Sequence, residues 1–271
     1  MNITRRSWLS AFIAAATLLA ACGTMVPTPA STADAVTRAA LAPKGVLRVG
    51  VYPGSPTSLV IDPKTGAKVG IAHDLGVKLA NDLGVSFELV EFRRVAEVIE
   101  ALKEGRVDFT FTNATAARAR DVDFTAPMLS VELGYIVPNG SPIVTVADID
   151  RPGNRVGVSE GSSSQGTLSK AYKNATLIPA PSLKNAGEML ASRRLDAFAT
   201  NKAVLYELKD LVPGTRILEG RWGEEHMAIA IPKGRDAGMT YLRKFAADAK
   251  ANGSFKSIVG KSGLRGAMAA D

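Results

Sequence analysis

An arginine and several small polar side chains are the residues of this chain whose types and spacing best suit the binding of a small molecule. Arg118 follows a β-favouring run at residues 107–111, and Thr112, Asn113 and Thr115 stand between the two. Open α/β sheets bind ligands at the carboxyl ends of their strands, where such side chains supply charge and hydrogen bonds. The segment therefore predicts a ligand site at the end of a buried strand.

Catalysis and metal binding have no comparable set of residues in the sequence. His73 and His226 are far apart and, with the single cysteine, form no metal-ligand spacing. No nucleophile–base pair or phosphate-binding loop can be assembled. We therefore expect no metal, no cofactor and no enzymatic activity, with structural roles for both histidines.

Strand and helix patterns alternate around the predicted site. Residues 47–51 and 87–90 are typical of strands, and residues 75–83, where leucine recurs every fourth position before Gly84, predict a helix. A second helix is predicted from about residue 95. Short connections between such elements predict a parallel sheet covered by helices. The other predicted elements are a hairpin loop at 61–66, an extended run at 130–138, a strand at 227–231 and a helix at 239–246.

Two segments of the chain repeat. Residues 155–162 match residues 48–55 at six of eight positions, and residues 188–201 match residues 100–113 without a gap. Matches that recur in the same order favour two α/β lobes built on one plan. In each lobe, the first turn after a strand and a later strand end would share one edge of the sheet. We therefore predict a cleft between the lobes, with candidate lining residues Tyr52, Ser55, Asn113, Gly161, Ser162, Ser163 and Asn201.

The amino terminus is typical of an exported protein. Residues 1–21 combine a basic start with an apolar run that is too short to span a membrane. Leu19-Ala20-Ala21-Cys22 resembles a bacterial lipobox, so we expect cleavage before Cys22 and a lipid on this cysteine. Residues 22–44 would then be a linker to the membrane, with a short helix at 33–41 capped by Ser31 or Thr32. The segment 4–9 also resembles a twin-arginine export motif, although the general secretory route tolerates adjacent arginines.

Charge and length limit the class of protein. The net charge of +7 is spread along the chain with alternating sign and without a basic block, which excludes an evident nucleic-acid-binding surface. The length of 271 residues is sufficient for a large core. We expect a monomer.

Taken together, several motifs are similar to those of the family 3 extracellular solute-binding proteins, the receptors of ATP-driven importers. The resemblance covers roughly residues 45–262 and is carried by residues 47–50, 101–108, 115–118, 123–127 and 155–162. It implies a type II periplasmic-binding-protein fold with a two-strand hinge, lobe 1 at 45–131 and 228–271, lobe 2 at 132–227, and an ABC permease as partner. It also implies a periplasmic location and an amino acid or related organic acid as ligand.

The resemblance assigns roles to individual residues. Arg118 falls where the family places an arginine that holds the ligand's α-carboxylate, and a guanidinium fork matches a carboxylate bidentately. Asn113 and Ser163 fall on positions that bond the same carboxylate, and Tyr52 and Ser55 fall on positions that flank the ligand.

Asn201 departs from the family pattern. It stands where the family usually has an acid that holds the α-amino group, and an amide does not neutralise an ammonium. Arg93 and Arg94, at the predicted cleft edge, would add positive potential or lie in a solvated loop. We therefore expect a small carboxylate-bearing ligand and hypothesise that it is anionic overall.

The sequence leaves two alternatives open. Some relatives with this fold are periplasmic enzymes, such as cyclohexadienyl or arogenate dehydratases and cell-wall lyases, and Glu160 is the candidate general acid for such a reaction. The other alternative is a ligand-sensing partner of a membrane receptor, whose folded body would be the same.

Overall fold

The computed structural model describes residues 33–268, and the structural statements below concern this part of the chain. Its α-helices are α1 Ala35–Leu41, α2 Ile71–Leu83, α3 Val95–Lys103, α4 Ser163–Ala171, α5 Leu183–Ala191, α6 Lys202–Leu211, α7 Asp236–Ala251 and α8 Ser254–Lys261. Its strands are β1 Val46–Val51, β2 Val60–Ile61, β3 Lys68–Val69, β4 Ser86–Glu91, β5 Thr110–Asn113, β6 Val122–Phe124, β7 Leu129–Pro138, β8 Arg155–Ser159, β9 Thr176–Ala180, β10 Ala197–Asn201, β11 Thr215–Ile217, β12 Gly223–Pro232 and β13 Ala267–Met268. The 3₁₀ turns are η1 Arg118–Arg120 and η2 Val146–Asp148.

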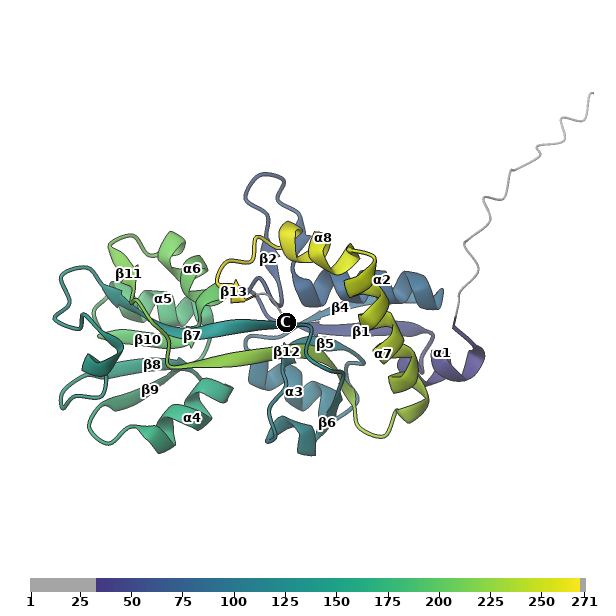
Figure 1. Cartoon of the computed structure of the whole chain (residues 1–271), viewed down its shortest axis with the longest axis horizontal. Coiled ribbons are helices and arrows are strands. Elements are labelled where there is room, and N and C mark those ends of the chain that lie inside the picture. The colour runs from purple at the N-terminus through teal and green to yellow at the C-terminus, as the bar shows by residue number, and fades with distance from the viewer. Residues whose placement is uncertain (1–32, 269–271) are drawn as a thin grey trace, which may run out of the picture. The chain divides into compact units, whose positions relative to one another are not determined.

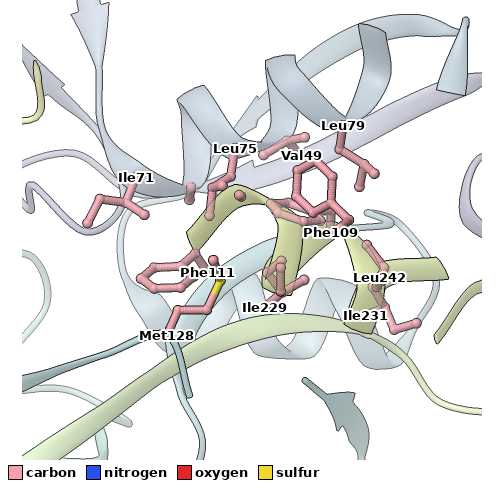
Figure 2. Packing of buried hydrophobic residues seen from close by; sticks show 14 of the residues in the cluster. Val49, Ile71, Leu75, Leu79, Phe109, Phe111, Met128, Ile229, Ile231 and Leu242 are labelled. Atoms are coloured by element: carbon pink, nitrogen blue, oxygen red, sulfur yellow. The ribbon is translucent and has the colours of Figure 1, made fainter. Parts of the chain in front are cut away.

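The first lobe is organised around β1 and β4, which pair in parallel as predicted. The leucines that recur along α2 are fully buried because their spacing places them on one face of the helix. Gly84 ends α2 in the left-handed conformation, with φ of 66°. Figure 2 shows Leu75 and Leu79 of α2 packing beside Val49 of β1 and Phe109. This core includes Ile229 and Ile231 of β12, so a late segment of the chain completes the first lobe.

The second lobe is organised around β10, β8 and β9, which are parallel to one another. Alternate residues of β10 contribute to different core clusters: Ala197 belongs to one together with Val156 of β8, and Phe198 belongs to another with helices α5 and α6. Buried residues on both faces are typical of parallel strands covered on two sides. The two α/β lobes predicted from the sequence repeat are therefore present.

Two long strands, β7 and β12, are shared between the lobes. They pair antiparallel over Leu129–Leu133 and Gly223–Met227. β7 then continues beside β10 and β11, whereas β12 continues beside β5 and β6. Figure 1 shows the two strands side by side between the groups of elements that form the lobes. The sequence patterns predicted the parallel strands but not these antiparallel pairings.

The lobe boundaries predicted at residues 131/132 and 227/228 fall inside these two strands. The short strand β13 also pairs with β7, so the end of the described chain returns to the same place. We propose that the chain passes from one lobe to the other at these two positions, within β7 and β12, which are continuous through them.

An arginine–aspartate pair occurs once in each lobe at equivalent positions of the repeat. Arg48 of β1 donates from Nε and Nη2 to the two carboxylate oxygens of Asp108, both at 2.8 Å. Arg155 of β8 binds Asp196 in the same way, at 2.9 and 2.8 Å. In both pairs the backbone N–H of the arginine also donates to the aspartate. The repeated residues are therefore structural, and each pair joins the start of one strand to the start of another.

Two predicted boundaries are wrong. Helix α1 begins at Ala35 and is capped by Asp34, whose carboxylate accepts a hydrogen bond from Thr37 N at 2.7 Å, rather than by Ser31 or Thr32. The strand predicted at 107–111 begins instead at Thr110 and continues to Asn113, because Phe109 makes only a single bridge to β1.

We predict that the two repeated pairs differ in their contribution to stability. Asp108 is fully buried and also accepts from Arg235 at 2.9 Å, so Asp108→Asn would leave two arginines without their counter-charge and cost about 3–5 kcal/mol of unfolding free energy. Asp196 has a third of its side chain exposed, and Asp196→Asn should cost about 1–3 kcal/mol. Urea unfolding would measure both. The exposed pair of Lys244 and Asp248 provides the control Asp248→Asn, expected to change stability by less than about 0.5 kcal/mol. A larger cost for Asp196→Asn than for Asp108→Asn would contradict the prediction.

Candidate functional site

A small cavity lies between the two lobes, at the carboxyl ends of β1, β5, β8 and β10. Both lobes and the shared strand β12 contribute to its lining. The lining residues are Tyr52, Arg94, Val95, Thr112, Asn113, Arg118, Ser159, Ser162, Ser163, Ser164, Leu183, Thr200, Asn201, Val204, Glu225 and Met227. Six of the predicted site residues, namely Tyr52, Asn113, Arg118, Ser162, Ser163 and Asn201, are therefore brought together.

Arg118 is held in place by the strand that precedes it. Its Nη1 donates to Thr112 Oγ1 at 2.9 Å and to the backbone oxygen of Asn113 at 3.1 Å. No carboxylate oxygen of the described residues lies within 4.0 Å of the guanidinium. Burial lowers the pKa of Arg118 below its ordinary value, while the negative charge of Glu225 opposes that change. The arginine therefore presents a positive charge to the cavity without a direct ionic partner.

The amino terminus of α4 forms the second-lobe side of the cavity. Ser162 caps the helix, since its hydroxyl accepts from Gln165 N at 3.1 Å. Ser163 accepts a hydrogen bond from Asn113 Nδ2 at 3.3 Å and donates to Glu225 Oε1 at 3.0 Å. Ser163 thus connects the first lobe to the hinge strand.

Asn201 ends β10 and caps α6. Its Oδ1 accepts from Val204 N at 3.1 Å, and its Nδ2 donates to Glu225 Oε2 at 2.9 Å. The cap fixes the orientation of the amide, because only the oxygen can accept from a backbone N–H. Asn201 consequently directs its donors, rather than its oxygen, toward Glu225.

Sequence reasoning missed Glu225. This residue lies on β12, has 7% of its surface exposed, and is one of the charged groups that line the cavity. The sequence contains a signal for Glu225 in the alternation of side chains along β12. Residues on one face of a strand recur at every second position, and Met227, Ile229 and Ile231 follow this spacing and are buried. Continuing this alternation by one step places Glu225 on the same inward face.

Three predicted residues lie outside the cavity lining. Ser55 is fully buried and shares a hydrogen bond of 2.9 Å with Thr57 in the loop after β1. Thr115 Oγ1 accepts from Arg118 N at 3.2 Å and so stabilises the turn that carries the arginine. Gly161, with φ of 71°, packs against Ala96 of the other lobe, where an added Cβ would approach within 2.6 Å of the alanine Cβ.

Tyr52 joins the two lobes at the rim of the cavity. It follows β1 in the first lobe and packs against the core cluster of the second lobe that contains Leu183. Burial raises the pKa of the Tyr52 hydroxyl, and hydrogen bonding to Ser55 opposes that rise. The phenol is therefore neutral near pH 7 and can donate or accept one hydrogen bond.

Arg94 and Glu160 form an ion pair between the lobes. Their closest atoms are 3.1 Å apart, and Arg94 also binds Glu97 on α3 at 3.2 Å. Arg93 is three-quarters exposed and pairs with Glu97. The positive charge predicted at the cleft edge is thus present in Arg94 but is largely compensated by two glutamates.

Glu160, His73 and His226 lie on separate segments and are not among the residues that line the cavity. Glu160 is half exposed and is not among the lining residues. His73 pairs with Asp74 at the start of α2, and exposed His226 shares a hydrogen bond with Ser130. Within residues 33–268, no cluster of His, Cys, Asp and Glu could hold a metal ion, and no helix is long and apolar enough to cross a membrane.

Comparisons with known proteins support the fold. The chain is 24% identical over 250 residues to the ABC transporter glutamine-binding protein GlnH of Bacillus subtilis. The matched part covers 90% of this chain and 91% of that protein. It is 28% identical over 160 residues to the virulence sensor protein BvgS of Bordetella pertussis, covering 58% of this chain and 13% of the sensor.

A solved structure of an ancestral arginine-binding protein bound to arginine superposes with a TM-score of 0.72. The two chains are 28% identical, and the matched part covers 80% of this chain and 98% of the other. Structures of this kind have the type II periplasmic-binding-protein fold, which confirms the fold class expected from the sequence.

The profile of one family, described as bacterial extracellular solute-binding proteins, family 3, matches residues 47–263, which include both lobes and every residue that lines the cavity. The chain is a member of the family 3 bacterial extracellular solute-binding proteins.

Proposed function

We propose that this protein captures a small solute that carries a carboxylate, closes its lobes around it, and delivers it to an ABC permease. The observation that supports this proposal best is the guanidinium of Arg118, which faces an interlobe cavity without a direct carboxylate partner. A carboxylate bound there would accept the fixed fork of donors and supply the missing negative charge. Relatives that bind glutamine or arginine favour an amino acid as the solute.

Contacts across the cleft support capture by closure. Asn113 binds Ser163, Arg94 binds Glu160, and Gly161 packs on Ala96, so each pair joins one lobe to the other. Of these residues, Asn113, Ser163 and Arg94 line the cavity. β7 and β12, the two strands that cross between the lobes, can act as a hinge because few residues have to change conformation.

Binding without turnover is the second part of the proposal. The candidate general acid Glu160 does not line the cavity and is engaged in an ion pair with Arg94. The second candidate function is that of a ligand-sensing partner of a membrane receptor, because the sensor BvgS contains a related segment. Pull-down from membranes would separate a permease from a receptor as the partner.

Replacing Arg118 tests the proposed carboxylate contact. Calorimetry against L-amino acids, dicarboxylates and keto acids should identify a ligand, and Arg118→Lys should weaken it about 10- to 100-fold because the bidentate fork is lost. Exposed Arg120, two positions later in η1, provides the control Arg120→Lys, which should bind as the wild type does. Prephenate and arogenate, added to the same panel, should not be converted. Unchanged affinity in Arg118→Lys, or conversion of either compound, would contradict the proposal.

Replacing Gly161 tests closure. An alanine there would adopt φ of 71° with strain and would bring its Cβ into Ala96 only when the lobes are together. Gly161→Ala should therefore weaken ligand binding about 10-fold or more by disfavouring the closed form. Gly166 on α4 has no other atoms within 4 Å of an added Cβ, so Gly166→Ala is the matched control. Equal affinities for the two variants would show that this contact does not limit closure.

We further propose that the mature protein is exported and held at a membrane by a lipid on Cys22. This residue, the signal at 1–21 and the twin-arginine motif all lie outside the described residues, so support comes from the lipobox pattern and the extracellular family. Mass spectrometry of the protein from the membrane fraction should find Cys22 as a lipidated amino terminus, and Cys22→Ala should release the protein from that fraction. A mature chain that retains residues 1–21 would contradict this proposal.

A further inference from the structure

We propose that Glu225 binds the ammonium group of the ligand, so that this chain takes a zwitterionic α-amino acid and supplies the negative charge from the hinge strand. This inference rests on the proposed function, because it assumes that Arg118 binds the carboxylate of the same ligand. It replaces our hypothesis of a ligand that is anionic overall.

The position of Glu225 suits this role. Its carboxylate lines the cavity that Arg118 also lines, yet the two residues are on different segments: Arg118 follows β5 and Glu225 lies on β12. No nitrogen of a described Lys, Arg or His lies within 4.0 Å of the Glu225 carboxylate. Among the described residues that line the cavity, Arg118 and Glu225 are therefore a positive and a negative group without a direct ionic partner, which matches the two ends of a zwitterion.

The hydrogen bonds of Glu225 leave room for a cation. Ser163 Oγ donates to one carboxylate oxygen and Asn201 Nδ2 donates to the other. Both are neutral donors, and an ionised carboxylate has about four lone-pair positions, so about two remain to accept from an ammonium. A buried charge that only neutral groups contact is costly, and a bound cation would reduce that cost.

Asn201 cannot take over this role, although it occupies the family's acid position. Its oxygen is engaged by Val204 N as the cap of α6, and its nitrogen points at Glu225. The side of the amide that faces the site is thus a donor, which an ammonium cannot use. The charge that appeared to be lost at residue 201 is present about one hydrogen bond away, on another element of the fold.

An anionic ligand fits this arrangement poorly. The two charges of Arg94 and Glu160 compensate each other, and Arg94 has a second partner in Glu97. Of the described charged residues that line the cavity, this leaves Arg118 and Glu225, whose formal charges cancel. A second negative group on the ligand would meet Glu225 without a compensating cation.

Calorimetry with matched pairs of ligands tests the proposal. The probes are L-alanine with pyruvate, L-valine with 2-oxoisovalerate, and L-glutamate with 2-oxoglutarate, since each keto acid keeps the carboxylate and lacks the ammonium. In the wild type, for the pair that binds best, we expect the amino acid to bind at least about 30-fold more tightly than its keto acid. In Glu225→Gln this preference should fall to within about threefold, because amino-acid binding weakens while keto-acid binding stays the same or improves.

Two further variants distinguish a local effect from a structural one. Glu224 is the next residue of β12, lies on the opposite face and does not line the cavity, so Glu224→Gln should keep the wild-type preference. Asp is as good a helix cap as Asn, so Asn201→Asp added to Glu225→Gln should restore a carboxylate beside the site and recover at least about tenfold of the preference.

The outcomes separate this proposal from the proposed function. If the wild type binds a keto acid as tightly as its amino acid, or if Glu225→Gln weakens both members of a pair equally, the role of Glu225 is wrong while carboxylate capture by Arg118 stands. If no carboxylate-bearing probe binds the wild type, both proposals fail. If Glu225→Gln does not fold, the wild-type comparison can still overturn the proposal.

Discussion

The repeated arginine–aspartate pair is the constraint on which the rest of the structure depends. Arg48 and Asp108 join the starts of two segments in one lobe, and Arg155 and Asp196 do the same in the other. Four or five residues after each of these positions the chain reaches the cavity. A slip of one residue would turn the side chains of a strand to its other face. The pairs therefore fix the register of the strands. As a result the carboxyl ends of four strands reach the cavity together, and the site is built from these four ends.

The site uses this alignment to collect groups that are distant in sequence. The first lobe contributes Arg118 and Asn113, and the second contributes Ser163 and Asn201. Glu225 comes from β12, between the lobes, and binds Ser163 and Asn201 directly. Closure and electrostatics are consequently coupled, because Ser163, which donates to the carboxylate of Glu225, also accepts a hydrogen bond from Asn113 of the first lobe.

The charge of a binding site depends on all the groups that line it and not on one residue alone. An amide at position 201 removes a charge from the second lobe, and seen along the chain alone it suggested an anionic solute. The amide instead caps α6 and donates to a buried glutamate. A charge can be moved between neighbouring elements because attraction depends on the distance through space and on burial, not on the strand that carries it.

The sequence by itself determined the two-lobe plan, its repeated motifs and six of the residues that line the cavity, because periodicity, turns and internal matches are local properties of the chain. It also placed Gly84 and the helix that it ends. Only the tertiary structure decided that Ser55, Thr115 and Gly161 lie outside the lining and that Glu225 lies within it. Those outcomes depend on how β12 pairs with β7 and β5 and on which faces the lobes present to each other. Such pairings join residues about a hundred positions apart, and no local pattern specifies them.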